Sequence, residues 1–464
     1  MSADVSEGFP ALDELGRMIC AGETTPSDLA RVALDRLDHA GRALNALAAL
    51  TPARALAEAA AAEADFAAGV DRGPLQGIPY GAKDLLAAAG YPTTWGATPL
   101  REQRFDRDAA VIERLTAGGA VLAGKLATVE LAGGFGYEQA NAAWTGPGRN
   151  PWNRDAWAGG SSSGSGAAVA AGLVPFAIGS ETWGSITVPA AFCGVSGLRP
   201  TYGRVSRRGA MALSWTMDKI GPIARSAADC AAVLAVIAGP DAGDPTTLHH
   251  PPFVAEVAPP ARFRLAALRG ATRNIQPEVA ANFQAALDVL AEFADLTEVD
   301  LPALPFEAAA NVVLQAEAAA AFEDFVESGA PLALTAPEDR LGMLDRFAIP
   351  AVDYLRALRV RRVAGRALDA LLAPFDAIVA PTQPHVAPPL DKRFDDYFDD
   401  DVSNLGGAGN LCGLPSITIP NGFGAGGLPT GLEIMARADA DARALSIAMA
   451  YQARTDWHRR RPSA

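Results

Sequence analysis

Residues 159–198 read GGSSSGSGAAVAAGLVPFAIGSETWGSITVPAAFCGVSGL, and this run constrains both the fold and the chemistry of the chain. From Ala156 to Leu198 the only charged residue is Glu181, although 20% of the whole chain is charged. A segment with so little charge is typical of a buried strand and helix, with Val174–Gly179 as the strand. Glycine weakens regular elements and buried hydroxyls need partners, so the Gly–Ser cluster indicates a functional site beyond packing alone.

Short apolar runs alternate with helical patterns along much of the chain. The other strand candidates are Ala120–Ala123, Arg264–Leu268, Leu296–Val299, Ala377–Ala380, Ser416–Ile419 and Leu432–Met435. Between two of them, Pro277–Phe293 carries apolar residues at the spacing of a helix. This alternation predicts an α/β protein with a mixed or parallel sheet covered by helices.

Residues 1–70 show helical patterns, with a helix start at Thr25-Pro26-Ser27-Asp28. We expect this N-terminal helical segment to pack on a single α/β domain formed by residues 71–464. The Pro-rich stretch 239–262 is expected to be a surface linker within that domain. The charged stretch 391–401 is expected to be a mobile loop, although its aromatic residues are also candidates for contact with a ligand.

Charge and cysteine content exclude several functional classes. The 464 residues carry a net charge of −14, which argues against binding bare nucleic acid. The four cysteines are scattered and predict neither a disulfide framework nor a zinc cluster. The start, MSADVSEGFP, lacks the apolar core of a signal peptide, and no apolar run is long enough to span a membrane. We therefore expect a soluble, cytoplasmic enzyme.

Two motif matches lead to chemistry that the rest of the sequence supports poorly. Residues 119–126 nearly fit a phosphate-binding loop, but Leu126 lacks the hydroxyl needed for magnesium, and Lys125 is better explained as a strand-end residue. Residues 160–164 fit a nucleophile elbow with Ser162 as nucleophile. That arrangement needs a downstream histidine, for which His385 is the one plausible candidate.

A serine and a lysine can perform the same chemistry without histidine. No histidine occurs between His39 and His249, whereas Lys83 lies in the apolar segment LQGIPYGAKDLLAAAG, residues 75–90. A lysine serves as a general base only if burial lowers its pKa from about 10.4 to about 7–8. The alternative is that Lys83 pairs with Asp84 or extends to water.

Seven segments together resemble the amidase signature family, over roughly residues 20–455. They are GIPYGAKD at 77–84, NPWN at 150–153, GGSSSGS at 159–165, ETWGSI at 181–186, PAAFCG at 189–194, GLRPT at 197–201 and GLP at 413–415. The resemblance implies a mixed, mostly parallel central sheet covered by helices on both faces. It also implies hydrolysis of a carbon–nitrogen bond without a metal or an organic cofactor.

The same resemblance implies a Ser–cisSer–Lys triad, with Ser185 as nucleophile, Ser161 as the bridging serine on a cis peptide, and Lys83 as base. The family stabilises the oxyanion with backbone N–H groups, here those of Thr182, Trp183, Gly184 and Ser185. The family usually reads D-T-G-G-S-I-R where this chain has E-T-W-G-S-I-T at 181–187. Trp183 thus replaces a glycine and is expected to wall the acyl pocket, and Thr187 replaces an arginine.

Six of the seven tryptophans lie within residues 95–215, which favours an apolar or aromatic substrate. The predicted substrate contacts are Trp183, Gly160, Trp144 and Trp215, and pocket shape depends on loops that include a variable region at about 306–350. We expect an amidase acting on a small aryl or apolar amide, with carbamates and esters as open alternatives, in a monomer or homodimer. The rival functions are the A subunit of a glutamyl-tRNA(Gln) amidotransferase and a non-catalytic family member that acts as a binding protein.

Overall fold

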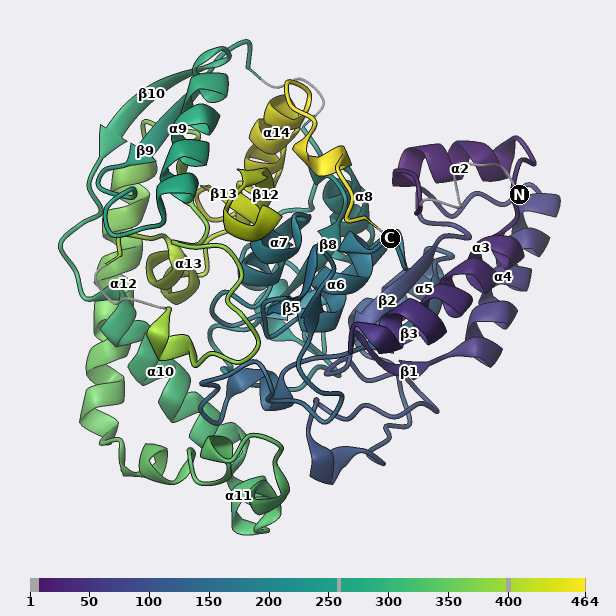
Figure 1. The fold of residues 1–464 in the computed structure, drawn as a ribbon, viewed down its shortest axis with the longest axis horizontal. Coiled ribbons are helices and arrows are strands. Elements are labelled where there is room, and N and C mark those ends of the chain that lie inside the picture. Colours follow the sequence, from purple (N-terminus) through teal and green to yellow (C-terminus); the bar gives the residue numbers. More distant parts are fainter. Residues whose placement is uncertain (1–7, 257–259, 398–401, 464) are drawn as a thin grey trace.

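One large sheet organises the chain. The computed structural model describes residues 8–256, 260–397 and 402–463, and places an 11-stranded sheet at their centre (Figure 1). In spatial order its strands are β1 (Leu47–Leu50), β3 (Val121–Leu126), β2 (Pro79–Lys83), β6 (Phe176–Glu181), β8 (Lys219–Ala224), β7 (Ser196–Arg199), β12 (Ser416–Phe423), β13 (Pro429–Met435), β11 (Ala377–Pro381), β9 (Phe263–Leu268) and β10 (Ala294–Val299). A separate hairpin pairs β4 (Arg149–Asn150) with β5 (Asn153–Trp157).

The expected mixed α/β sheet is confirmed, with its parallel pairs gathered in two groups. Strands β3, β2 and β6 pair in parallel, as do β11, β9 and β10. From β6 through β8, β7, β12 and β13 to β11, each neighbouring pair is antiparallel. The centre is therefore less parallel than expected, since β12 and β13 form a hairpin whose short connection cannot make a parallel crossover.

Helices cover the sheet on both faces (Figure 1). They are α2 (Leu12–Cys20), α3 (Pro26–Arg36), α4 (Pro52–Ala67), α5 (Ala110–Ala117), α6 (Ser163–Ala170), α7 (Thr187–Cys193), α8 (Ala227–Ile237), α9 (Pro277–Ala291), α10 (Phe306–Ala321), α11 (Glu323–Glu327), α12 (Ala351–Leu372), α13 (Gly406–Cys412) and α14 (Asp441–Gln452). Helix α6 packs with α7, whereas α8 packs with α5 and α14. No helix in the described ranges combines the length and the hydropathy needed to cross a membrane.

The N-terminal segment contains more than the predicted helices. The helix start at Thr25 is confirmed, since its side chain accepts a hydrogen bond from the Asp28 N–H at 3.1 Å and Pro26 occupies the first turn. Strand β1, which was not predicted, pairs with β3 at the edge of the sheet. Residues 1–7 lie outside the described part of the chain.

Helix α6 approaches its neighbours closely because it carries glycine where a side chain would collide with backbone. A Cβ atom on Gly164 would lie 2.4 Å from the Ala46 carbonyl oxygen and 2.5 Å from the Ala127 nitrogen. Both atoms belong to main chain that cannot move without disturbing β3 and its surroundings. The glycine thus lets the start of α6 lie against the chain just before β1 and just after β3.

Substitution Gly164→Ala is therefore expected to destabilise the protein by about 3 kcal/mol or more, because overpacking against backbone cannot relax. The matched control is Gly365→Ala in α12, where nothing lies within 4 Å of the new methyl group. Alanine there should stabilise the helix by about 0.5–1 kcal/mol. Urea unfolding of both variants measures the difference, and equal effects would contradict the close approach.

Candidate active site

Three side chains from distant parts of the sequence form a continuous hydrogen-bonded chain. Lys83 lies at the end of β2, Ser161 follows a cis peptide bond from Gly160, and Ser185 precedes α7. The Lys83 Nζ donates to Ser161 Oγ at 2.8 Å, and Ser161 Oγ lies 3.0 Å from Ser185 Oγ. The structure thus brings together the three residues that the resemblance assigned to a triad.

Lys83 is fully buried and has no acidic partner within ion-pairing distance in the described residues. Burial lowers the pKa of Lys83 to about 7, even though the charges of Asp218 and Glu181 act in the opposite direction. The neighbouring Asp84 instead forms an ion pair with Lys125 Nζ at 3.0 Å. The alternative pairing of Lys83 with Asp84 is therefore wrong, and Lys125 is a β3 residue as expected.

Ser180 of β6 is a further partner of Lys83 that the sequence did not reveal. Its Oγ accepts a hydrogen bond from Lys83 Nζ at 3.0 Å, and its carbonyl oxygen lies 3.4 Å from the same nitrogen. Parallel pairing of β2 with β6 brings these strand ends together. Two hydroxyls and one carbonyl thus surround the amine, and none of them restores its charge as a carboxylate would.

The turn from Glu181 to Ser185 is shaped by the Glu181 carboxylate. One oxygen accepts hydrogen bonds from the N–H groups of Ile186 and Thr187 at 2.8 and 3.0 Å. The other accepts a hydrogen bond from Arg199 Nη1 at 2.9 Å. Burial by itself would raise the pKa of Glu181, but the charges of Arg199 and Lys219 outweigh it and lower that pKa to about 2. Glu181 therefore stays ionised and pins the start of α7 beside Ser185.

Four backbone N–H groups in this turn, those of Thr182, Trp183, Gly184 and Ser185, donate to no acceptor within the described residues. Gly184 has φ 82°, a left-handed conformation that favours glycine and turns the chain before the serine. Free, preorganised donors beside a serine hydroxyl are suited to stabilising negative charge on a substrate oxygen. The Trp183 indole packs close to Gly406 of α13.

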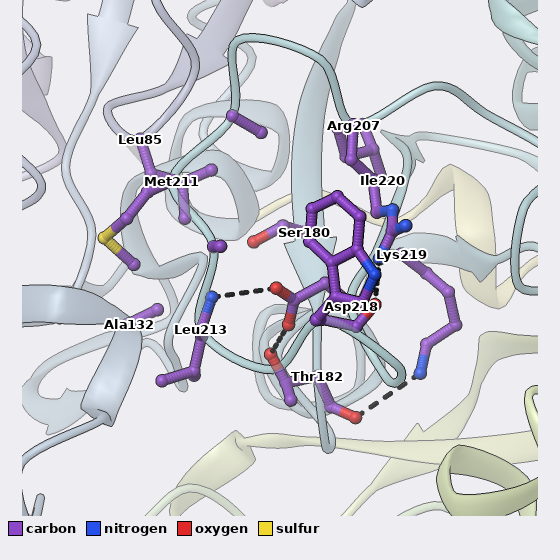
Figure 2. Close-up of a pocket in the computed structure, with 13 residues that line it drawn as sticks. Leu85, Ala132, Ser180, Thr182, Arg207, Met211, Leu213, Asp218, Lys219 and Ile220 are labelled. Carbon is purple, nitrogen blue, oxygen red and sulfur yellow. Dashed lines mark hydrogen bonds between the residues drawn. The ribbon is translucent and has the colours of Figure 1, made fainter. Parts of the chain in front are cut away.

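A cavity lies beside Ser180 and Thr182, at the end of β6 and the start of the turn (Figure 2). Its apolar wall contains Leu85, Met211, Leu213, Trp215 and Ile220. Ser180, the partner of Lys83, and Thr182, which begins the turn, line the same cavity. Lys83, Ser161 and Ser185 are not among the lining residues, so Ser180 and Thr182 are what connects the cavity to them.

Three charged side chains line the cavity, and each is bonded within the protein. Arg207 pairs with Asp244 at 3.2 Å and stacks on the Trp215 ring at 4.9 Å. Asp218 accepts hydrogen bonds from Thr182 Oγ1 at 2.5 Å and from the Leu213 N–H at 2.8 Å. The Lys219 Nζ lies 3.4 Å from the Thr182 carbonyl oxygen (Figure 2).

The cavity loop at 207–218 is braced from outside by α10. The Glu317 carboxylate accepts hydrogen bonds from the Ser214 hydroxyl at 2.6 Å, the Thr216 N–H at 2.9 Å and the Thr216 hydroxyl at 2.9 Å. No residue of 306–350 lines the cavity, so this region contributes to it through Glu317. No pattern in the sequence signalled this contact, because the two segments are about one hundred positions apart.

The four residues predicted to contact substrate do not all line this cavity. Trp215 lines the cavity, whereas Trp183, Gly160 and Trp144 do not. The Trp144 Nε1 donates to Thr94 Oγ1 at 2.7 Å. A Cβ on Gly160 would lie 2.2 Å from the Tyr137 hydroxyl, so Gly160 faces an aromatic cluster.

The nucleophile elbow is not formed. Ser162 Oγ lies 3.2 Å from the Ser180 carbonyl oxygen. The His385 ring stacks with Phe192 at 5.9 Å, and its Nδ1 lies 2.8 Å from the Val386 carbonyl oxygen. The described residues also contain no group of three His, Cys, Asp or Glu side chains placed to hold a metal ion.

Comparison with known proteins matches the family model described as Amidase to residues 28–445. The chain belongs to the amidase family. It is 38% identical to the A subunit of a glutamyl-tRNA(Gln) amidotransferase from Roseiflexus sp., over 97% of each chain. Its fold superimposes on the native peptide amidase from Stenotrophomonas maltophilia with a TM-score of 0.84 and 33% identity, over 98% of each chain. For the amidotransferase A subunit from Thermotoga maritima the values are 0.78 and 29%, over 95% and 94%.

Membership in the amidase family makes this protein an enzyme that hydrolyses carbon–nitrogen bonds. The departures from the usual family sequence are accommodated locally. Thr187, in the position of the usual arginine, places its Oγ1 3.2 Å from the Glu181 carboxylate. Arg199 supplies the cation to that carboxylate from β7.

Substitution Lys83→Met is expected to raise the stability of the folded protein, because it removes a buried amine. A folded-state pKa about three units below the unfolded value of about 10.4 costs about 4 kcal/mol below pH 7, less the hydrogen bonds lost to Ser161 and Ser180. Between pH 7 and 10.4 the unfolded state binds more protons, so this cost shrinks as pH rises. Urea unfolding should therefore show a stability gain of about 2–4 kcal/mol at pH 6.5 that fades by pH 10.

The control is Lys392→Met, which changes an exposed lysine and should leave stability nearly unchanged at every pH. Equal unfolding free energies for wild type and Lys83→Met at pH 6.5 would show that the buried amine keeps an ordinary pKa.

Proposed function

We propose that the protein is an amidase that forms an acyl-enzyme on Ser185, with Ser161 and Lys83 as its proton relay. The observation that carries this proposal is the chain from Lys83 Nζ to Ser161 Oγ to Ser185 Oγ, with steps of 2.8 and 3.0 Å. A lysine with a pKa of about 7 is partly neutral at physiological pH and is able to accept a proton. An intact relay also argues against a non-catalytic binding protein.

The reaction proceeds in two halves. Ser185 Oγ attacks the amide carbon, while its proton passes to Ser161 and the Ser161 proton passes to Lys83. The resulting oxyanion accepts hydrogen bonds from the free N–H groups of the turn. The relay then returns a proton to the leaving nitrogen, the C–N bond breaks, and water hydrolyses the ester to a carboxylic acid and Ser185.

The cavity of Figure 2 supports a substrate with an apolar or aryl acyl group. Leu85, Met211, Leu213 and Trp215 offer apolar contact, and the charged residues of its wall are already bonded to protein groups. Carbamates and esters of similar shape fit the same chemistry, because both transfer an acyl group to a serine.

The second candidate is the A subunit of a glutamyl-tRNA(Gln) amidotransferase, which is the name of relatives that match nearly the whole chain. Glutamine would bring an ammonium and a carboxylate into the acyl pocket, and each would need a charged partner. Arg207 is paired with Asp244, and the Asp218 carboxylate accepts the Thr182 hydroxyl and two backbone N–H groups. Lys219 contacts only carbonyl oxygens and is available to a substrate carboxylate, but among the described residues the wall offers no carboxylate without hydrogen-bond partners for the substrate ammonium. That missing partner for the ammonium is the feature that favours the small-molecule amidase.

A fluorophosphonate probe is expected to label wild-type protein stoichiometrically, and Ser185→Ala should abolish both labelling and turnover. Loss of the nucleophile of a working relay lowers kcat on the order of 10⁶-fold. The matched control Ser162→Ala should still be labelled. Loss of labelling in Ser162→Ala with labelling retained in Ser185→Ala would identify the elbow serine as nucleophile.

A substrate panel is expected to separate the two candidate functions. Anilides, aryl carbamates and aryl esters with apolar acyl groups should be hydrolysed, with a rate that rises through an apparent pKa near 7 as the Lys83 amine becomes neutral. Glutamine should be a poor substrate. Efficient hydrolysis of glutamine without turnover of the aryl substrates would overturn the small-molecule assignment.

A further inference from the structure

Thr182, the first residue of the turn, is held by two consecutive residues at the start of β8. Its hydroxyl donates to Asp218 Oδ1 at 2.5 Å, and its carbonyl oxygen lies 3.4 Å from Lys219 Nζ (Figure 2). The Lys219 nitrogen also donates to the Met217 carbonyl oxygen. The side chain and the main chain of Thr182 are thus fixed separately.

The Thr182 carbonyl and the Trp183 N–H belong to one peptide group. A trans peptide is planar, and its C=O and N–H point in opposite directions. Whatever holds the carbonyl therefore also sets the direction of the N–H. The Trp183 N–H is among the donors with no acceptor within the described residues.

The surroundings of Lys219 make this contact unusual. The side chain is buried, at 2% exposure, and no carboxylate in the described residues lies within ion-pairing distance of its nitrogen. Lys125, in contrast, is buried against the Asp84 carboxylate at 3.0 Å. A buried amine without an acidic partner is costly, and an apolar residue of the same length would avoid that cost.

We propose that Lys219 is a positioning residue for the oxyanion hole: by holding the Thr182 carbonyl, it directs the Trp183 N–H toward the substrate oxygen. This inference rests on the proposed acyl-enzyme function and names a device within the same site. A donor on the carbonyl oxygen also polarises the peptide, which strengthens its N–H as a donor. The gain appears when charge develops on the substrate, so it stabilises the transition state more than the bound substrate.

The decisive variant is Lys219→Met, measured with the best ester or anilide of the substrate panel. We expect kcat to fall about 10- to 100-fold with KM changed less than about threefold, because a misdirected donor costs less than the 10²–10³ of a deleted one. Affinity for a boronic acid, which forms a tetrahedral adduct on the serine, should fall in parallel with kcat.

Lys219→Gln provides the rescue, because its amide retains an N–H donor and should recover part of the lost kcat even where Lys219→Met folds poorly. The matched control Lys392→Met should behave as wild type. Wild-type kcat in Lys219→Met, a loss confined to KM, or equal loss in Met and Gln variants would overturn the inference. Absence of turnover in wild type would instead overturn the proposed function.

Discussion

The absence of an acid beside the Lys83 amine, within the described residues, is the constraint on which the rest of the site depends. A carboxylate in contact would hold the pKa of this lysine near its usual value, and almost no neutral amine would exist at pH 7. Asp84 is adjacent in sequence but is engaged by Lys125 and by the hydroxyl of Thr94. Asp218 and Glu181 act only through space, and the resulting pKa is about 7. Burial lowers the pKa of Lys83 and the distant negative charges raise it, and the resulting pKa suits a general base near neutral pH.

The sheet topology makes this arrangement possible. Strands β2 and β6 run parallel, so Lys83 and Ser180 lie at the same end of the sheet, where both strands have their carboxyl ends. Strand β8 runs antiparallel to β6, so it begins at that same end of the sheet, and Lys219 lies opposite Glu181. Ligands of open α/β sheets bind outside the carboxyl ends of strands. In this protein the first residues of the antiparallel strand β8 lie beside the carboxyl ends of β2 and β6, so three strands contribute to the site.

Strands formed mostly by apolar runs were predicted well from the sequence. Strands in which glycine, proline or charged residues interrupt the apolar run were missed. Strands β9, β11, β12 and β13 lie where the apolar runs predicted them. Strands β2, β7 and β8 were not predicted, because PYGAK, SGLR and KIGPIA mix glycine, proline and charge. Lys83 was a candidate from its apolar segment, whereas Ser161 and Ser185 were assigned their roles through the resemblance, since no local pattern joins residues 78 and 24 positions apart. Lys219 was not singled out, because it begins β8 directly after Asp218 and such a pair of opposite charges is typical of a solvated turn.

In the proposed mechanism, Asp218 couples catalysis to substrate choice. Its carboxylate accepts the Thr182 hydroxyl of the turn and also the N–H groups of Leu213 and Ser214 in the cavity loop. Any change that moves the loop to fit a new acyl group therefore shifts an anchor of the turn and, through its charge, the pKa of Lys83. Relatives with the same fold carry names as different as peptide amidase and glutamyl-tRNA(Gln) amidotransferase. In this chain, a loop change that keeps the Asp218 carboxylate and the donors facing it would leave the turn anchored.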